Sequence, residues 1–166
     1  YGTTKQYAEW ISGELSADLF DKSDIKTAEL SKYKTIIFGG ALYAGGISGI
    51  DIIKKNYGKI KDKNIIIFTV GIGDPQNKEQ FVMIINKNLT DEMKENIPVY
   101  HLRGKMDYST MNAIHKAMMG MVTKVIAKKP EESRTAEDRD ILNGKNADYI
   151  DKSTIQPIID KAKSFK

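Results

Sequence analysis

The sequence contains no cysteine among its 166 residues, and it has only two histidines. The absence of cysteine excludes disulfide bonds, thiolate metal sites and thiol catalysis. No apolar run approaches the length of a membrane-spanning helix, and the polar first residues do not resemble a secretory signal. Neither His101 nor His115 has a second metal-ligating residue at a suitable spacing, so the sequence predicts no metal site. It also lacks Gly-x-Ser-x-Gly, and we predict no catalytic residue.

Positive charge exceeds negative charge, and the excess is local. The chain has 26 Lys and Arg against 22 Asp and Glu, for a net charge of +4. Residues 101–130 carry six bases and one acid, a net charge of +5, whereas residues 131–151 carry seven acids and three bases, a net charge of −4. A basic block followed by an acidic block differs from the general basicity of nucleic-acid-binding proteins, so we predict no nucleic-acid partner.

Hydrophobic periodicity predicts helices that alternate with strands. Strands are expected at Thr35–Phe38, ended by Gly39 and Gly40, at Asn64–Val70 and at Ile97–Leu102, with a weak candidate at Ala17–Phe20. Helices are expected at Lys5–Leu15, Ile50–Tyr57, Lys78–Lys87, Thr90–Asn96, Asp107–Lys129 and Thr154–Ser164. Thr3 or Thr4 is expected to cap the first of these helices. Ser153 is expected to cap the last, which has Pro157 in its first turn. A polar loop is expected over residues 131–148, within an acidic stretch that extends to 151. Strict alternation favours a single α/β domain over residues 1–166, with a doubly wound parallel sheet in a three-layer αβα arrangement.

An alternating fold of this kind ordinarily opens with a strand that leads into the first ligand-binding loop. No strand precedes the first predicted helix, so we expect the first strand of the sheet to be missing from this sequence. The alternative is a sheet with one strand fewer. If the strand is missing, we expect the chain as given to bind a phosphate ligand more weakly than a chain that includes the strand.

Three loops follow predicted strands or precede the first helix, and they are rich in glycine or hydroxyl groups. Tyr1, Gly2, Thr3 and Thr4 open a helix, where free N–H groups and the helix dipole favour an anion. The alternative is that the two threonines only cap the helix. The chain lacks Gly-x-x-x-x-Gly-Lys-[Ser/Thr], which excludes a nucleotide-hydrolysing P-loop.

The second and third loops follow the two strongest strands. The second loop is Gly39–Gly46, whose four glycines let the backbone approach a flat ligand and in which Tyr43 is placed to stack on an aromatic ring. The alternative is a flexible turn. In the third, Gly71, Ile72, Gly73 and Asp74 offer peptide groups to the polar edge of such a ring. Gly-x-Gly-x-x-Gly is absent, which argues against a dinucleotide.

The segments Tyr1–Ile11, Phe38–Gly46 and Phe68–Asp74 together resemble the three cofactor loops of flavodoxins. The resemblance covers Tyr1 to about Leu102 and the last helix. It implies a flavodoxin-like fold, non-covalent FMN as cofactor, and electron transfer to a redox partner protein or a quinone. The lack of cysteine and of a secretory signal separately leads us to expect a cytoplasmic location. It implies FMN binding by Tyr1, Gly2, Thr3, Thr4, Ala41, Leu42, Tyr43, Ala44, Gly45, Val70, Gly71, Ile72, Gly73 and Asp74.

Within this superfamily the sequence is most similar to the branch that includes menaquinone-dependent protoporphyrinogen oxidase. Members of that branch carry an additional apolar and basic helical segment, and Met106–Lys129 resembles it. The resemblance leaves open an electron carrier and an oxidoreductase that passes electrons to a quinone. Two departures are the absent first strand and the basic net charge. A flavin-free protein with the same fold is a further alternative. A signalling receiver domain is disfavoured, because it would need a phosphate-accepting aspartate at the strand end, where this chain has Phe38-Gly39-Gly40.

The segment Met106–Lys129 contains five of the seven methionines. One helical stripe comprises Met111, Ile114, Met118, Met121 or Val122, and Val125, and an ordinary core face explains it. It does not explain the off-stripe Met119, Ile126 and Ala127, nor the neighbouring Lys116, Lys124, Lys128 and Lys129. A helix with a broad apolar face and lysines on either side of it is typical of a surface that contacts an anionic membrane or an amphipathic substrate. The two interpretations imply, respectively, a buried helix and peripheral membrane contact through residues 106–129.

Overall fold

The central sheet has the strand order β2-β1-β3-β4, in which β1 (Thr35–Tyr43), β3 (Asn64–Gly71) and β4 (Val99–Arg103) run parallel. The short β2 (Gly46–Ile47) pairs antiparallel with the end of β1. This computed structural model describes residues 2–111 and 113–165, with all side chains except those of residues 27, 114, 115 and 118. A second, two-stranded antiparallel sheet joins β5 (Lys105–Met106) to β6 (Ala147–Asp148).

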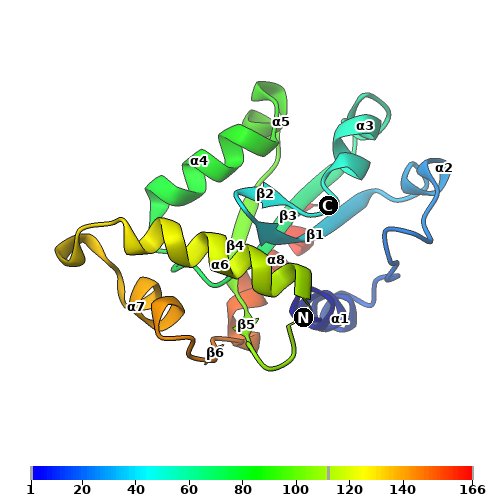
Figure 1. Cartoon of the computed structure of the whole chain (residues 1–166). Coiled ribbons are helices and arrows are strands. Elements are labelled where there is room, and N and C mark those ends of the chain that lie inside the picture. The colour runs from blue at the N-terminus through cyan, green and yellow to red at the C-terminus, as the bar shows by residue number, and fades with distance from the viewer. Residues whose placement is uncertain (1, 112, 166) are drawn as a thin grey trace.

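Helices cover both faces of the central sheet (Figure 1). The helices α1 (Thr3–Leu15) and α8 (Gln156–Ser164) pack on one face, and α3 (Asp51–Ile60), α4 (Lys78–Asn88) and α5 (Asp91–Asn96) pack on the other. The remaining elements are α2 (Thr27–Leu30), α6 (Ala113–Ala127), α7 (Ala136–Leu142), η1 (Glu131–Ser133) and η2 (Lys152–Ile155). The prediction of a parallel sheet between two helical layers is therefore confirmed.

The side chains of β3 explain why both faces of the sheet are covered. Ile65 and Ile67 point into the core beneath α3, α4 and α5, whereas Ile66 and Phe68 point into the core beneath α1 and α8. Successive side chains of a strand alternate between its two faces, so an uninterrupted apolar strand requires two hydrophobic partners. Each fully buried isoleucine contributes about 1.5–3 kcal/mol to stability, and this strand holds the ligand edge in place.

The prediction that Gly39 and Gly40 end the first strand is wrong, because β1 continues through them to Tyr43. A Cβ on Gly39 would overlap the ring of Phe68, and one on Gly40 would lie 2.6 Å from Ile47 Cγ2. The two glycines therefore allow close packing across the strand rather than a turn. The turn comes after Tyr43, and the helix expected from Ile50 begins at Asp51 and runs to Ile60.

The weak strand predicted at Ala17–Phe20 is not formed. Leu19 and Phe20 are exposed, and these residues have no regular structure. A strand needs a neighbour for its peptide groups, and none of the described residues offers one here.

The outer edge of β1 is correspondingly open. The carbonyl oxygen of Lys34 accepts from Asn64 N–H on the β3 side, and that of Ala41 accepts from Ser48 N–H on the opposite side. Because peptide groups alternate along a strand, those of Thr35, Ile37 and Gly39 face the same outer side as Ala41. Among the described residues, none pairs with them. The expectation of a further first strand stays a prediction.

Four local predictions also need correction. The first helix begins at Thr3, and its cap is Gly2, so neither threonine caps it by a side-chain hydrogen bond. Asp151, not Ser153, caps the C-terminal helical segment, because its carboxylate accepts from Ser153 N–H. Pro157 lies in the first turn of α8, as predicted. Residues 131–148 are not a continuous loop, since they contain η1, α7 and β6, and the Thr135 capping box starts α7.

The Met-rich helix is shorter than predicted, and the described C-terminal part of its apolar stripe is exposed. Residues 107–111 form a turn, and α6 covers Ala113–Ala127. Met121, Val122 and Val125 are exposed, whereas the off-stripe Ile126 is buried. The stripe positions 114 and 118 lie outside the described side chains. No helix among the described residues is long and apolar enough to cross a membrane.

Candidate functional site

The carboxyl ends of the three parallel strands bring the predicted loops together at one edge. Ala41 pairs with Val70, and Gly71 pairs with Arg103, so the ends of β1, β3 and β4 are in register. The side chain of Leu42 lies against Gly71, because a Cβ there would be 3.1 Å from Leu42 Cδ1. Ligands of open α/β sheets bind at this edge.

The N-terminus of α1 lies at the same edge. Gly104 follows β4 and donates a 2.7 Å hydrogen bond to the carbonyl oxygen of Gly71. Thr3 Cγ2 is only 3.6 Å from the position that a Cβ on Gly104 would occupy. The first helix and the third loop are thus both packed around Gly104. Tyr1, the first predicted site residue, lies outside the described residues.

The first turn of α1 has the features of an anion site. Gly2 has a left-handed backbone with φ of 78°, and it caps the helix without a side-chain hydrogen bond. The backbone N–H groups of Thr3, Thr4 and Lys5 find no partner among the described residues. The first turn contains no acidic side chain to compete for them. Such N–H groups and the positive end of the helix dipole favour a bound anion.

The hydroxyl of Thr3 is an unusual buried polar group. Only 7% of Thr3 is exposed, yet its hydroxyl makes no hydrogen bond within the described part of the chain. Buried hydroxyls are ordinarily paired, since an unpaired one costs about 1–3 kcal/mol. A ligand oxygen at the α1 N-terminus would give this group a partner.

The second loop is a two-residue hairpin turn that presents Tyr43. Tyr43 pairs with Gly46, so Ala44 and Gly45 form the turn, with φ of 47° and 74°. Positive φ at both positions is the mark of a type I′ turn, which is unfavourable for alanine. The side chain of Tyr43 is 38% exposed at this turn.

Two side chains of α4 hold the strained turn in place. Asn88 is buried; its Nδ2 donates a 2.8 Å hydrogen bond to Gly45 O, and its Oδ1 accepts a 2.9 Å bond from Ile47 N–H. Lys87 Nζ donates a 3.0 Å bond to Ala44 O. The helix therefore satisfies peptide groups within the turn and just after it, which fixes the approach of Tyr43.

The third loop uses its carbonyl groups within the protein and leaves N–H groups available. The carbonyl oxygens of Gly71 and Ile72 accept from Gly104 N–H and from Arg103, and Asp74 Oδ1 accepts from Gln76 N–H. The N–H groups at positions 72–74 have no partner among the residues that the structure describes. This loop is therefore better suited to donate hydrogen bonds to a ligand than to accept them.

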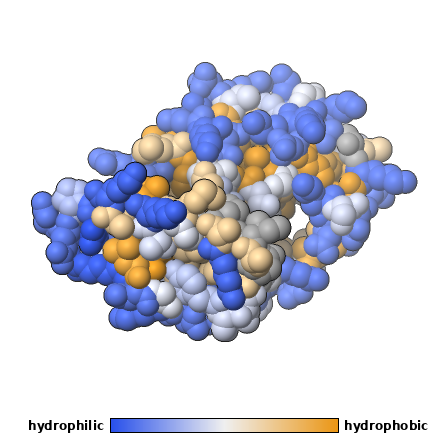
Figure 2. Space-filling model, in the orientation of Figure 1, coloured by the Kyte–Doolittle hydropathy of each residue, from blue (hydrophilic) through white to orange (hydrophobic). Residues whose placement is uncertain are grey.

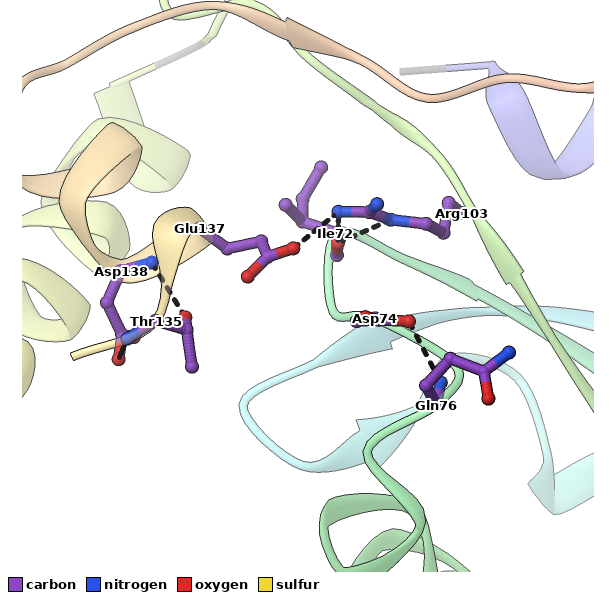
Figure 3. Close-up of polar contacts among 7 residues, drawn as sticks. All are labelled: Ile72, Asp74, Gln76, Arg103, Thr135, Glu137 and Asp138. Carbon is purple, nitrogen blue, oxygen red and sulfur yellow. Dashed lines mark hydrogen bonds and ion pairs between the residues drawn. The ribbon is translucent and has the colours of Figure 1, made fainter. Parts of the chain in front are cut away.

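Arg103 connects the third loop to the acidic segment (Figure 3). Its Nε and Nη2 lie 3.3 and 3.2 Å from Ile72 O, and its Nη2 also lies 2.9 Å from Glu137 Oε1 on α7. The guanidinium group stacks 3.6 Å from the ring centre of Tyr149. A planar guanidinium suits this combination of two acceptors and an aromatic face.

A second ion pair holds α7 against the end of α6. Lys129 Nζ lies 2.9 Å from Asp138 Oδ2, and Thr135 N–H also donates to this carboxylate. Burial alone would raise the pKa of Asp138, but hydrogen bonds from Lys129 and Thr135 outweigh it and keep the pKa below its usual value. Asp138 therefore stays ionised, and Lys129 has a structural role.

The surroundings of His101 are those of a structural residue. It lies on β4, where its Nδ1 is 2.6 Å from Thr69 Oγ1 and its ring stacks on Phe81 with centroids 3.7 Å apart. Burial lowers its pKa to about 4, so the ring is neutral near pH 7. The described part of the chain contains no cluster of three metal-ligating side chains.

Sequence reasoning did not identify Asn88, Lys87, Arg103 or Glu137 as neighbours of the loops. Arg103 could have been found, because it ends the last strand at the ligand edge. The other three come from helices whose packing no local pattern reveals. Two shallow surface hollows occur elsewhere, one around Glu14 and Lys152 and the other between η1 and α7, and neither is lined by a predicted site residue.

Comparison with known proteins agrees with this geometry. The model of the flavodoxin domain family matches residues 1–134, which include all three loops, the whole parallel sheet and α6. No curated protein matches the chain. Because the family match spans well over half of the sequence, the chain belongs to the flavodoxin domain family.

Proposed function

We propose that the chain binds FMN non-covalently at the carboxyl edge of its sheet and uses it for electron transfer. The observation that carries the proposal is the meeting of three loops at one edge, two of them with backbone N–H groups that have no partner among the described residues. Membership of the flavodoxin domain family supports it, because such domains generally bind FMN.

In this proposal the N-terminus of α1 holds the phosphate. The N–H groups of Thr3, Thr4 and Lys5 are available to phosphate oxygens, and no acid in the first turn repels them. The buried hydroxyl of Thr3 adds a donor without adding charge. The residues present therefore fit a phosphate group.

The flat ring would lie between the Tyr43 turn and the third loop. Tyr43 offers an aromatic face, and the N–H groups at positions 72–74 can donate to the carbonyl oxygens of the flavin ring. FMN, when bound, supplies reversible one- and two-electron chemistry. The protein contributes a turn fixed by Asn88 and a loop fixed by Arg103, which hold the ring and limit its contact with water.

A second candidate is an oxidoreductase of the protoporphyrinogen-oxidase type. The sequence of Met106–Lys129 resembles the additional segment of that branch, and the exposed apolar side chains of α6 favour contact with a large apolar substrate. Such an enzyme would take electrons from that substrate and pass them to a quinone. Quinone reduction by the FMN-loaded protein with protoporphyrinogen as donor would distinguish it from an electron carrier.

The test of FMN binding is a fluorescence titration of protein expressed from its complete reading frame. We expect quenching that saturates near one FMN per chain. Gly2→Asp should weaken FMN binding at least tenfold relative to Gly2→Asn, because both residues tolerate φ of 78° but only aspartate repels phosphate. Riboflavin, which lacks the phosphate, should not distinguish the two variants.

Two results would contradict the proposal in different ways. Absence of quenching by the parent protein would favour the flavin-free scaffold. Equal loss of FMN and riboflavin affinity in Gly2→Asp would instead show that the phosphate does not lie at the α1 N-terminus.

A further inference from the structure

The helix α6 exposes large apolar side chains to solvent. Met121 is 60% exposed and Val125 is 63% exposed, and Val122 between them is also exposed. Met121 and Val125 form what we call the Met121 face, and Val122 borders it on the side of the buried Ile126. Figure 2 shows hydrophobic atoms beside strongly hydrophilic ones in the region of α6 and α7. Scattered single apolar residues are normal on a surface, but three on two turns of one helix require an explanation.

The buried side of α6 fixes how this face is oriented. Ile126 is only 4% exposed and marks the side of the helix that packs on the protein. At 100° per residue, Met121 lies about 140° from Ile126, and Lys124 lies about 160° from it. Met121 and Val125 form one i,i+4 row, and Lys124 forms the adjacent row together with Lys128, which lies one residue beyond the end of α6. The apolar row and the basic row therefore lie side by side on the outer surface.

Three of the four lysines of this segment are available for an external partner. Lys129 is engaged by Asp138, whereas Lys116, Lys124 and Lys128 form no ion pair among the described residues. Two acids, Glu131 and Glu132, are exposed just beyond the end of the helix, after Pro130. The exposed part of α6 itself carries only basic charge, so its charge complements an anionic surface.

The internal contacts of the segment keep this surface presented. Arg134 Nη2 donates to Ala127 O, and its Nε donates to Lys129 O, which secures the last turn of α6. The ion pair of Lys129 with Asp138 holds α7 against this end of the helix. The Met121 face therefore need not be released from the protein before it can contact a partner.

We propose that α6 is an interfacial helix that docks on an anionic lipid bilayer through the Met121 face, with Lys124 and Lys128 on the lipid headgroups. A helix with an apolar row and a basic row lies in the plane of the interface, where burial of the apolar row and attraction to anionic lipids add. The proposal does not depend on FMN binding.

Co-sedimentation with vesicles of stated composition tests the docking. We expect the parent protein to bind vesicles of phosphatidylcholine with one-quarter phosphatidylglycerol at low salt, and to bind pure phosphatidylcholine much more weakly. A lysine near an anionic surface is worth about fivefold in affinity, so Lys124→Gln with Lys128→Gln should weaken binding by about twenty-five-fold. High salt should remove most of this difference.

A matched control separates local docking from general basicity. Lys54→Gln with Lys55→Gln on α3 removes the same charge from exposed positions and should leave binding unchanged. Met121→Gln with Val125→Gln should weaken binding at both salt concentrations, whereas Met83→Gln, an exposed methionine on α4, should not. A parent protein that stays in the supernatant, or equal losses in the α3 and α6 lysine variants, would overturn the proposal.

Discussion

Arg103, at the end of β4, donates two hydrogen bonds to the carbonyl oxygen of Ile72 in the loop after β3, at 3.2 and 3.3 Å. The same guanidinium group forms an ion pair with Glu137 on α7. One side chain thus joins Ile72 in a predicted ligand loop to Glu137 on a helix much further along the chain. The position of the third loop therefore depends on the segment that follows the sheet.

Replacement of Arg103 should affect stability and ligand binding together. Arg103→Gln leaves the carboxylate of Glu137 without its partner, and we expect a loss of about 1–2 kcal/mol in the free energy of unfolding. FMN affinity should also fall, because the third loop loses a support. Lys105→Gln is the control, since its 3.7 Å pair with Asp148 is exposed and should contribute under about 0.5 kcal/mol. Similar effects of the two variants would argue against this role.

Asn88 should be essential to the hairpin turn. Asn88→Ala leaves Ile47 N–H and Gly45 O without partners, and we expect a loss of about 2–3 kcal/mol in unfolding free energy, measured by denaturation. Trp10, packed edge-on against Tyr7, is a natural fluorescence probe. Asn86→Ala, at an exposed position of the same helix, should change stability by under about 0.5 kcal/mol. If the Asn88 variant is as stable as this control, the hydrogen bonds of Asn88 do not hold the turn in place.

Tyr43 should matter for flavin binding more than for folding. Stacking on an aromatic ring contributes about 0.5–1.5 kcal/mol beyond area burial, so Tyr43→Ala should weaken FMN binding about two- to tenfold and shift its redox potentials. Tyr43→Phe keeps the ring and should retain most of the affinity. Titration and potentiometry measure both quantities. If affinity and potentials are the same in Tyr43→Ala as in the parent, the residue belongs to an ordinary turn.

His101 should make the protein less stable in acid. Burial lowers its pKa in the folded state to about 4, whereas the unfolded chain has a value near 6.5. Between these values only the unfolded state binds the proton. The stabilising contribution is therefore complete above about pH 6.5 and is lost as the pH falls towards about 4.

The measurement is the free energy of unfolding from pH 7.5 to 4.5, for the parent and for His101→Gln. The variant cannot titrate at this position, so its stability should decline less over this range. The carboxylates titrate in both proteins, and the difference between the curves isolates His101. If unfolding free energy falls equally with pH in the parent and in His101→Gln, the lowered pKa of His101 is contradicted.

Much of the fold could be predicted because its elements have strong local patterns. The uninterrupted apolar run of β3 requires two covered faces, and the family match and the two cores confirm that architecture. The positions of the second and third loops follow from the strand ends, since parallel strands place their carboxyl ends at one edge, whereas the first loop is placed there by the packing of Thr3 near Gly104. Their role in binding FMN stays a prediction.

The errors occurred where distant packing decides local structure. Gly39 and Gly40 have the composition of a turn, but the approach of Phe68 and Ile47 makes them strand residues. The residues of the Met121 face have the pattern of a core face, yet Met121 and Val125 are exposed, and the buried Ile126 lies off that stripe. The acidic segment looked like a loop, but Thr135 starts a helix in it, and Glu137 on that helix reaches Arg103. The contact of Gly39 with Phe68 and the ion pair of Glu137 with Arg103 join residues far apart in the sequence, whereas the Thr135 capping box is a local signal that could have predicted α7.

The open edge of β1 also bears on the behaviour of the chain at high concentration. Residues 35–43 contain no charged side chain and no proline, and the outward peptide groups of Thr35, Ile37 and Gly39 have no partner among the described residues. Natural sheets protect such edges with lysine, proline or bulges, because an unprotected edge is a template for strands of other molecules. We therefore expect the chain to self-associate by edge-to-edge pairing unless another strand covers β1, so its solubility is limited by backbone hydrogen bonding rather than by its net charge.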